Sequence, residues 1–411
     1  MALSFHYHQL SNGLDIVAER NPDAHSVAMG LFVKTGSRDE DRSVNGVSHF
    51  LEHMMFKGSS KYTWEDVNRI FDEIGAKYNA FTSQEMTAYY ANVLPEFTER
   101  ALEHLSHLLR PAIRTEDFTT EKKVILEEIA MYLDDPGHRL YERLMESHFG
   151  THPLSMSILG SADSIQKLGR DQMAEYFQRR YGPGNMVLSV TGQIEFEQIL
   201  RLAEKYCGQW PHVDAPRQQP PPVYRPQRLT MTDDKLNRQY TMAMMPGPSA
   251  QDEQRFAAHV LADVVGDSDG SRLYWALVDN AVAEEADFGF YPHDGCGSFY
   301  LALTTDPART QQALDTALKE LEKAKSDVKD DEVERAKNKI ASGLVLQGEV
   351  PLGRMRSIGG QWVYNREYRS LEKDMAALNG VTTGSLIQLM RDYPFDPMTI
   401  VSLGPEKQAK S

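Results

Sequence analysis

Proline is concentrated in one segment near the middle of the chain, residues 211–228. Proline fixes φ and has no backbone N–H, so at this density it excludes a helix or a central strand and favours a stiff, extended connector. The segment divides the 411 residues almost evenly, and each side has the length of a domain of about 200 residues. We therefore predict an N-terminal domain over 1–210, a linker over 211–228 and a C-terminal domain over 229–411.

The first domain combines strands that come in hairpins with helices that come in runs. An Asn12-Gly13 turn indicates a hairpin, and Thr63 with Asp66 indicates a helix N-terminus. Because strands and helices do not alternate one by one, we predict an α+β fold rather than a Rossmann-type fold. The apolar patterns predict strands over 14–18, 27–33, 79–82, 86–93 and 186–190, and helices over 47–56, 63–75, 97–109 and 120–133.

One of these helices contains the sequence HFLEH, in which His49 and His53 lie one turn apart on the same face. This is the spacing at which two imidazoles can bind one zinc ion. Glu52 lies beside His53, where it would deprotonate a water that zinc activates. The pattern is H-x-x-E-H, the reverse order of the H-E-x-x-H motif. The alternative is a helix with two exposed histidines, but apolar neighbours such as Phe50 and Met54 indicate a mostly buried helix.

A catalytic zinc site needs a third protein ligand, and two acids in the helix predicted over 120–133 are candidates. Glu121 and Glu128 are two turns apart, so they share one helix face with apolar side chains such as Ile125. A buried, unpaired carboxylate is costly, so a cation is expected nearby. One of the two acids would complete the zinc site, and Glu121 is also a candidate to orient an imidazole. Glu127 lies about 100° round the helix and is expected to face solvent.

The second domain resembles a degenerate copy of the first. A strand over 239–246 followed by a helix over 253–265 repeats the order seen around the motif. That helix carries His259, Ala262 and Asp263 at the spacing of the H-x-x-E-H residues, so one ligand and the base are missing. We therefore predict two homologous halves, each a mainly antiparallel sheet packed with helices, of which only the first keeps the site.

The composition limits the partners to be expected. A formal net charge of −15 argues against non-specific nucleic-acid binding. It suits a cavity that attracts basic peptides, although the same charge also serves solubility alone. No apolar run of about 18 or more residues occurs, so we expect no membrane span.

The number of cysteines and the N-terminal residues indicate the cellular compartment in which the chain is expected. The chain has two cysteines, Cys207 and Cys296, too few for a disulfide framework or a thiolate zinc site, and a reducing compartment fits best. The first residues lack the basic and apolar regions of a secretory signal. We expect a cytoplasmic location, or alternatively an organelle matrix after removal of a transit peptide.

Residues 46–58, GVSHFLEHMMFKG, closely resemble the active-site helix of the pitrilysin family, which includes insulysin and the mitochondrial processing peptidase. The resemblance implies a processing-peptidase-like metallohydrolase fold with one zinc ion per chain. The site residues that it implies are the zinc ligands His49, His53 and Glu128, the catalytic base Glu52, and Glu121 as the buried acid beside a ligand.

The resemblance extends to a strand beside the site. Residues 79–82 resemble the family strand that pairs with the substrate backbone next to the metal. The substrate-binding residues that this implies are Asn79, Ala80, Phe81 and Thr82.

The second half departs from the family at one important place. Many self-sufficient members have an arginine and a tyrosine that hold the substrate carbonyl and the transition state, and Val278 and Glu285 stand at the corresponding positions here. A homologous partner subunit could supply that pair, in a heterodimer or a homodimer. The chain length resembles the short-subunit branch, whose members pair into a hollow shell. The short loop over 265–270 resembles the catalytic, β-like subunit.

Three hypotheses follow. The leading one is a zinc endopeptidase that cleaves peptides or presequence-like unfolded segments inside a clam-like chamber, with a partner subunit needed for full activity. The second is a non-catalytic core subunit of the same family, which the complete ligand set disfavours and the missing arginine and tyrosine favour. The third, a small-molecule metallohydrolase of related fold, is disfavoured because it needs neither a duplicated half nor a linker.

Overall fold

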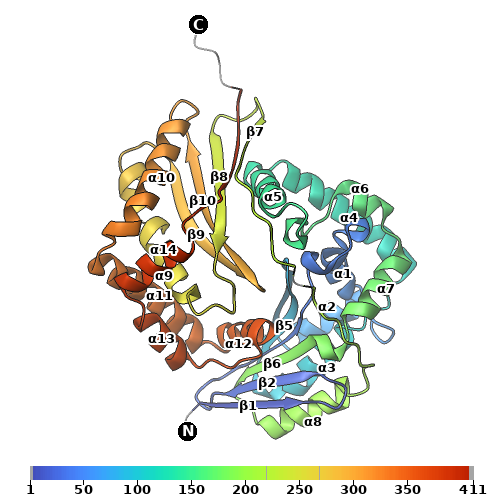
Figure 1. Ribbon diagram of the computed structural model, residues 1–411. Coiled ribbons are helices and arrows are strands. Elements are labelled where there is room, and N and C mark those ends of the chain that lie inside the picture. The colour runs from blue at the N-terminus through green and yellow to red at the C-terminus, as the bar shows by residue number, and fades with distance from the viewer. Residues whose placement is uncertain (1–2, 219, 268, 407–411) are drawn as a thin grey trace. The chain divides into compact units, whose positions relative to one another are not determined.

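A computed structural model describes residues 3–218, 220–267 and 269–406. The chain divides into two compact units, each with one sheet packed against helices, which confirms the predicted α+β class with two homologous halves (Figure 1). Unit 1 takes its residues from 1–130, 156–218 and 345–369, and unit 2 takes its residues from 131–155, 219–344 and 370–411.

The sheet of unit 1 has the strand order β1-β2-β6-β3-β5-β4. Neighbours are antiparallel except β2 and β6, which are parallel. The hairpin predicted at Asn12-Gly13 joins β1 to β2, and Gly13 has the positive φ of 92° that such a turn favours. The strands are β1 (Ser4–Gln9), β2 (Asp15–Arg20), β3 (Val27–Val33), β4 (Lys77–Thr82), β5 (Thr87–Val93) and β6 (Met186–Gly192).

Helices of unit 1 cover the sheet and carry the motif. The helix predicted from Thr63 begins with the expected capping box between Thr63 and Asp66. The helices are α1 (Val47–Met55), α2 (Trp64–Glu73), α3 (Thr98–Leu108), α6 (Ala162–Lys167), α7 (Arg170–Arg180) and α8 (Phe196–Cys207). Short 3₁₀ turns are η1 (Ser37–Asp39), η2 (Arg42–Val44), η3 (Pro95–Phe97) and η5 (Pro183–Asn185).

The sheet of unit 2 has the order β7-β11-β8-β10-β9, which repeats the order β2-β6-β3-β5-β4 of unit 1 strand for strand. The repeat includes the single parallel pair, β7 with β11. The strands are β7 (Gln227–Thr232), β8 (Gln239–Gly247), β9 (Glu285–His293), β10 (Cys296–Thr305) and β11 (Thr399–Gly404). Because β7 begins at Gln227, the last two residues of the predicted linker lie in a strand.

Unit 2 has its own apolar core between the sheet and its helices. Its helices are α5 (Pro136–Phe149), η4 (Pro153–Ser155), α9 (Arg255–Gly266), the π-helix η6 (Tyr274–Val278), α10 (Thr310–Asp327), α13 (Leu371–Asn379) and α14 (Thr383–Asp392). Two long helices, α4 (Thr115–Leu133) and α11 (Asp330–Glu349), run from one unit into the other. No helix in the described residues is long and apolar enough to cross a membrane.

Each half of the sequence gives one helix to the other half's sheet. Helix α12 (Pro351–Asn365) belongs to unit 1 and packs on β3 and β6. Helix α5 belongs to unit 2 and packs on β8 and β11, the strands equivalent to β3 and β6. A single cut at the proline-rich segment therefore separates each helix from the sheet that it covers. The ranges 1–210 and 229–411 therefore stay a prediction of where the two homologous halves lie in the sequence.

Helix α12 fits closely against its sheet. A Cβ at Gly359 would lie 2.3 Å from Cε2 of Phe32, so no larger residue fits there without a shift. Arg354 forms a buried ion pair with Glu19, at 2.6 Å from Nη2 to Oε2. Trp362 donates its indole N–H to Asp15 over 2.8 Å. These contacts fix the helix by polar bonds as well as by apolar packing.

Candidate metal centre

The helix that carries the motif is fixed at its start by a distant carboxylate. Gly46, the N-cap residue of α1, has φ of 94° and has no side chain with which to cap the helix. Instead Glu40 accepts hydrogen bonds from the backbone N–H groups of Gly46 and Ser48, each at 2.7 Å. Such an anion suits the positive end of the helix dipole. Burial raises the pKa of Glu40 to about 7, although these hydrogen bonds oppose the shift.

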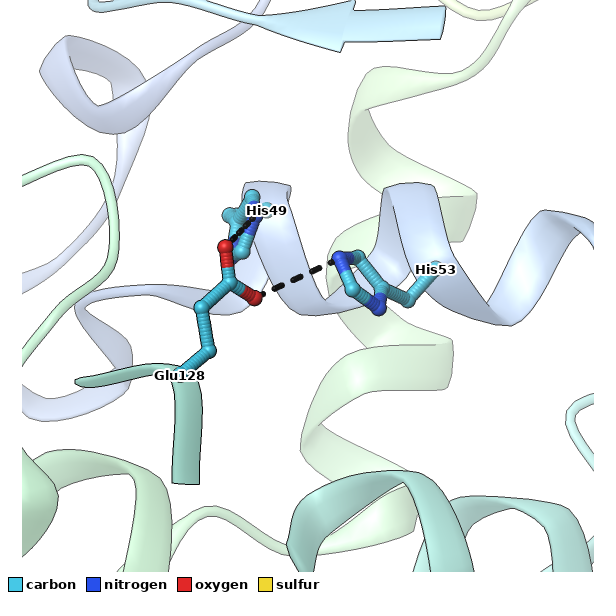
Figure 2. Close-up of side chains that lie close together, drawn as sticks. All are labelled: His49, His53 and Glu128. Atoms are coloured by element: carbon cyan, nitrogen blue, oxygen red, sulfur yellow. Dashed lines mark ion pairs between the residues drawn. The ribbon is translucent and has the colours of Figure 1, made fainter. Parts of the chain in front are cut away.

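The structure brings His49, His53 and Glu128 together (Figure 2). Their candidate ligand atoms all lie within 4.8 Å of one another. Nε2 of His49 is 3.8 Å from Oε1 of Glu128, and Nε2 of His53 is 3.6 Å from Oε2. Atoms bound to one tetrahedral zinc ion, each about 2.0–2.2 Å from it, lie roughly 3.3–3.6 Å apart, so the donor set fits the ion after small shifts. Within the described residues no other group of three such side chains is this close.

Buried apolar side chains hold this donor set in place. Phe50, Leu51 and Met54 of α1 are fully buried, so the histidines occupy the remaining face of the helix. Burial lowers the pKa of His49 to about 4, and its ring is therefore neutral near pH 7 with a lone pair available to a metal. Nδ1 of His49 is buried and has no hydrogen-bond partner.

Glu121 orients the other imidazole. Its Oε1 lies 2.9 Å from Nδ1 of His53, which turns Nε2 of that ring toward Glu128. Its Oε2 lies 2.5 Å from Nζ of Lys57, a partner that sequence reasoning did not identify. Burial lowers the pKa of His53, but the hydrogen bond to Glu121 and the nearby carboxylates outweigh it and raise the pKa overall.

Glu52 lies beside the donor set and has one close partner. Thr82 donates its hydroxyl to Oε2 of Glu52 over 2.5 Å. Burial raises the pKa of Glu52 above its ordinary value, and the hydrogen bond from Thr82 opposes that shift. A raised carboxylate pKa suits a group that must both take up and release a proton near neutral pH.

The other predicted site residues are on the last strand of the sheet. Asn79, Ala80, Phe81 and Thr82 belong to β4, which pairs with β5 at the end of the strand order. Thr82 faces Glu52, whereas Asn79 is exposed. The prediction that this strand binds a substrate backbone stays a prediction, and the structure adds that Thr82 contacts the candidate base.

The equivalent slot in unit 2 has different chemistry. Asp263 of α9 is the predicted counterpart of His53, and burial together with the neighbouring Asp267 raises its pKa to about 7. Nζ of Lys339 lies 2.7 Å from Asp267, so a lysine supplies the positive charge there. Val278 ends η6, and Glu285 begins β9 and accepts a hydrogen bond from Thr304.

Replacing Glu121 by glutamine is expected to weaken zinc binding about 10–100-fold, because the charge that orients His53 is lost. The measurement is competition with a chromogenic zinc chelator. Glu127→Gln is the matched control, since Glu127 is an exposed carboxylate on the same helix. Equal zinc affinities in the two variants would show that Glu121 does not serve the site.

Comparison with known families now adds to this geometry. Residues 15–162 match the insulinase (peptidase family M16) model, and residues 167–340 match the peptidase M16 inactive domain. The chain belongs to the M16 peptidase family. The resemblance to insulysin and pitrilysin is thereby confirmed, and the match to an inactive domain agrees with the degenerate slot of the second half.

M16 relatives match along almost the whole chain. An uncharacterized zinc protease of Streptomyces coelicolor is 28% identical over 98% of this chain and 90% of its own. The uncharacterized zinc protease YmxG of Bacillus subtilis is 29% identical over 96% of this chain and 97% of its own.

Solved structures share the fold at lower identity. A protease from Helicobacter pylori superposes with a TM-score of 0.91 at 20% identity, covering 98% of this chain and 100% of its own. A chain of complex III2 from Candida albicans superposes with a TM-score of 0.86 at 18% identity, covering 98% of this chain and 96% of its own. These likenesses establish the M16 fold with two homologous halves.

Proposed function

We propose that this chain is a zinc-dependent endopeptidase. The observation that carries the proposal is the group formed by His49, His53 and Glu128, with the carboxylate of Glu52 beside it. Two imidazoles and a carboxylate are a donor set that suits zinc and leaves a coordination position open. Relatives named zinc proteases support the same assignment.

The residues of the chain have distinct parts in the proposed reaction. A bound zinc ion would supply Lewis acidity at the scissile carbonyl. Glu52 takes the proton from the attacking water and later passes it to the leaving amine, for which its raised pKa is suited. Thr82 holds the carboxylate of Glu52 in one orientation through its hydroxyl. Glu121 holds the ring of His53 so that its Nε2 faces Glu128, where the metal would bind.

We further propose that the substrates are peptides or presequence-like unfolded segments, cleaved inside a chamber that a homologous partner subunit helps to form. The net charge of −15 supports basic peptides as substrates. Val278 and Glu285 support the need for a partner, since neither side chain can donate a hydrogen bond to a substrate carbonyl as arginine or tyrosine does. A homodimer and a heterodimer both satisfy this requirement.

The two cysteines support a reducing compartment. Cys207 and Cys296 are both free and both buried. Burial raises the pKa of Cys207 to about 12, so its thiol is unreactive in the folded chain. We propose a cytoplasmic location, with an organelle matrix as the alternative.

Metal removal tests the proposed function. The purified chain is expected to contain close to one zinc ion per molecule, as the single group of candidate ligands in the described residues indicates. Cleavage of an unstructured basic peptide, by the chain alone or mixed with a homologous partner, is expected to stop on chelation and to return when zinc is added. Metal analysis and peptide digestion measured on the same samples give both results.

The competing function is a non-catalytic core subunit, which the likeness to a chain of complex III2 and the missing arginine and tyrosine favour. That function predicts no zinc in the purified chain and no cleavage with any partner. Zinc at near one per chain together with chelator-sensitive cleavage would exclude it.

A further inference from the structure

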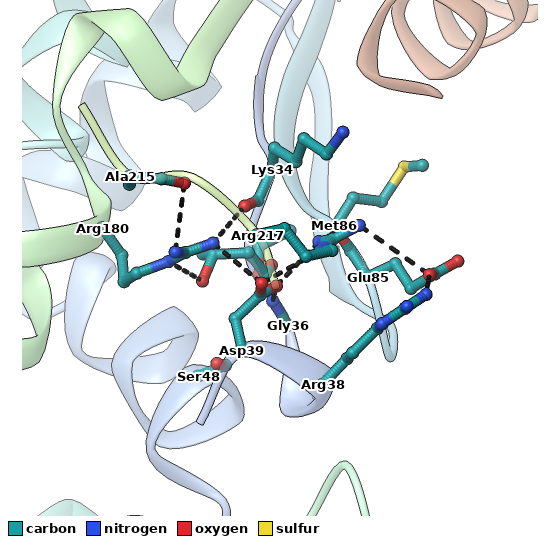
Figure 3. A network of polar contacts seen from close by, with 12 residues as sticks. Lys34, Gly36, Arg38, Asp39, Ser48, Glu85, Met86, Arg180, Ala215 and Arg217 are labelled. Carbon is teal, nitrogen blue, oxygen red and sulfur yellow. Dashed lines mark hydrogen bonds and ion pairs between the residues drawn. The ribbon is translucent and has the colours of Figure 1, made fainter. Parts of the chain in front are cut away.

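A buried arginine from the proline-rich segment is bonded into the catalytic half (Figure 3). The side chain of Arg217 is only 2% exposed. It binds the carboxylate of Asp39 through two parallel hydrogen bonds, at 2.9 Å from Nε and 2.7 Å from Nη2. Its Nη2 also donates to the backbone oxygen of Glu85 over 2.5 Å. The segment predicted only as a stiff connector is therefore attached to unit 1 by a specific contact.

The two acids do not need Arg217 to balance their charge. Asp39 already has Arg180, at 2.9 Å from Nη2 to Oδ1. Glu85 already has Arg38, at 2.5 Å from Nη1 to Oε1, with both side chains 1% exposed. A third buried guanidinium adds a desolvation cost without being required for neutrality. Arg38 already joins the two acidic loops. What Arg217 adds is a bond from the proline-rich segment to both of them, because its side chain contacts Asp39 and Glu85.

One of those loops leads directly into the site. Glu85 lies in the turn between β4 and β5, and Thr82 is the last residue of β4. The loop with Asp39 packs against this turn, since the N–H of Arg38 donates to the oxygen of Gln84 over 2.8 Å. A Cβ at Gly36 would lie 2.2 Å from the oxygen of Ser83, so the two backbones are in direct contact.

We infer that Arg217 is a positioning residue for the candidate base, acting through the turn after Thr82. It holds the turn over 83–86 between the loop with Asp39 and the proline-rich segment. This turn then fixes the hydroxyl of Thr82 against Glu52. The backbone of the segment is held as well, because Arg180 donates to the oxygen of Ala215 over 3.2 Å. The inference rests on the proposed function, in which Glu52 is the base.

The test compares five variants of the full chain. Arg217→Ala is expected to lower kcat for an unstructured peptide about 10-fold or more, since misplacing a catalytic group by about 1 Å can cost about 100-fold. KM and zinc affinity are expected to stay unchanged. Arg217→Lys, which keeps the charge but not the paired hydrogen bonds, is expected to recover part of kcat. Arg225→Ala is the matched control, an exposed arginine from the same segment.

The fourth and fifth variants show whether Arg217 acts through Thr82. Thr82→Val removes the hydroxyl that contacts Glu52, and the double variant with Arg217→Ala is expected to be no slower than Thr82→Val alone. Amide hydrogen exchange over 83–86 is expected to be faster in Arg217→Ala than in wild type or Arg225→Ala. Because Asp39 and Glu85 each keep one arginine, the fold is expected to survive, and a thermal melt checks this.

The results can overturn the inference separately from the proposed function. Unchanged kcat and unchanged hydrogen exchange in Arg217→Ala would show that the contact does not position the turn. Losses that multiply in the double variant would show that Arg217 acts by a route other than Thr82. If wild type cleaves no peptide even with zinc and a partner, the proposed function fails, and with it the catalytic part of the inference. Hydrogen exchange then still decides whether Arg217 holds the turn.

Discussion

Glu52→Gln is expected to lower the rate of peptide cleavage about 10²- to 10⁴-fold, the contribution usual for a general base. Glutamine has the shape of glutamate but cannot take a proton from water. Its side-chain oxygen can still accept the hydrogen bond from Thr82, so the local geometry should persist. The candidate zinc ligands His49, His53 and Glu128 are untouched, and zinc content should therefore stay near that of wild type.

Single-turnover cleavage of a fluorogenic peptide and metal analysis of the same preparation measure the two effects. Glu127→Gln serves again as the control for loss of one exposed carboxylate. A Glu52→Gln variant that cleaves as fast as the parent would exclude Glu52 as the base. A variant that loses zinc and activity together would indicate that Glu52 acts on the metal group and not on the water.

A fragment of residues 1–228 is expected not to fold, although it contains all the predicted site residues. The fragment lacks α12, whose buried side chains include Met355, Ile358, Trp362 and Val363. Burying each such side chain contributes about 1.5–3 kcal/mol, so the loss is about 6–12 kcal/mol, which is comparable with the whole stability of a typical domain. The fragment also leaves Glu19 without its buried partner Arg354.

Circular dichroism and thermal melting of the fragment measure this loss. Mixing it with a fragment of residues 229–411 is expected to restore a cooperative melt, since each fragment then supplies the helix that the other lacks. The control is the full chain nicked near residue 222, in the exposed part of the proline-rich segment, which should remain folded. A cooperative melt of 1–228 alone, at the temperature of the full chain, would contradict the role of α12.

Features encoded locally could be predicted from the sequence. The strand predicted over 27–33 coincides with β3, because an uninterrupted apolar run bounded by polar residues is typical of a buried strand. The helix predicted over 47–56 is one residue longer than α1, which ends at Met55. The capping box of Thr63 and Asp66 was recognisable because both partners are three residues apart.

Features that depend on tertiary partners could not be predicted. Nothing in the pattern of α12 shows that it covers β3 and not a strand of its own half, since an apolar helix face does not by itself specify the sheet that it packs on. Helix α4 begins at Thr115, five residues before the predicted start, because four of those five residues are polar and Phe118 alone extends the apolar face. The proline-rich composition of the linker gave no sign that Arg217 is buried and bonded. Its two partners lie more than a hundred residues away in the sequence.

The candidate site likewise contains residues that could be predicted from local sequence and residues that could not. The spacing of His49 and His53 is a local signal, and the structure places both rings beside Glu128. Glu40 gave no signal, because it binds the start of α1 from a loop and belongs to no periodic pattern. Thr82 was predicted only as part of a substrate-binding strand, and its hydroxyl bond to Glu52 required the fold to bring β4 and α1 together.

The helix that unit 1 receives from the second half has a consequence for biosynthesis. The last strand of the first sheet, β6, ends at Gly192, but α12 is complete only at Asn365. At about 5–20 residues per second, the ribosome needs roughly 10–35 s to make the residues between them. During that interval one face of the nascent sheet, with Phe32 and Tyr90, has no cover. The candidate zinc ligands are therefore synthesised well before the helix that covers their sheet. Chaperone protection of the growing polypeptide is expected to matter for its yield.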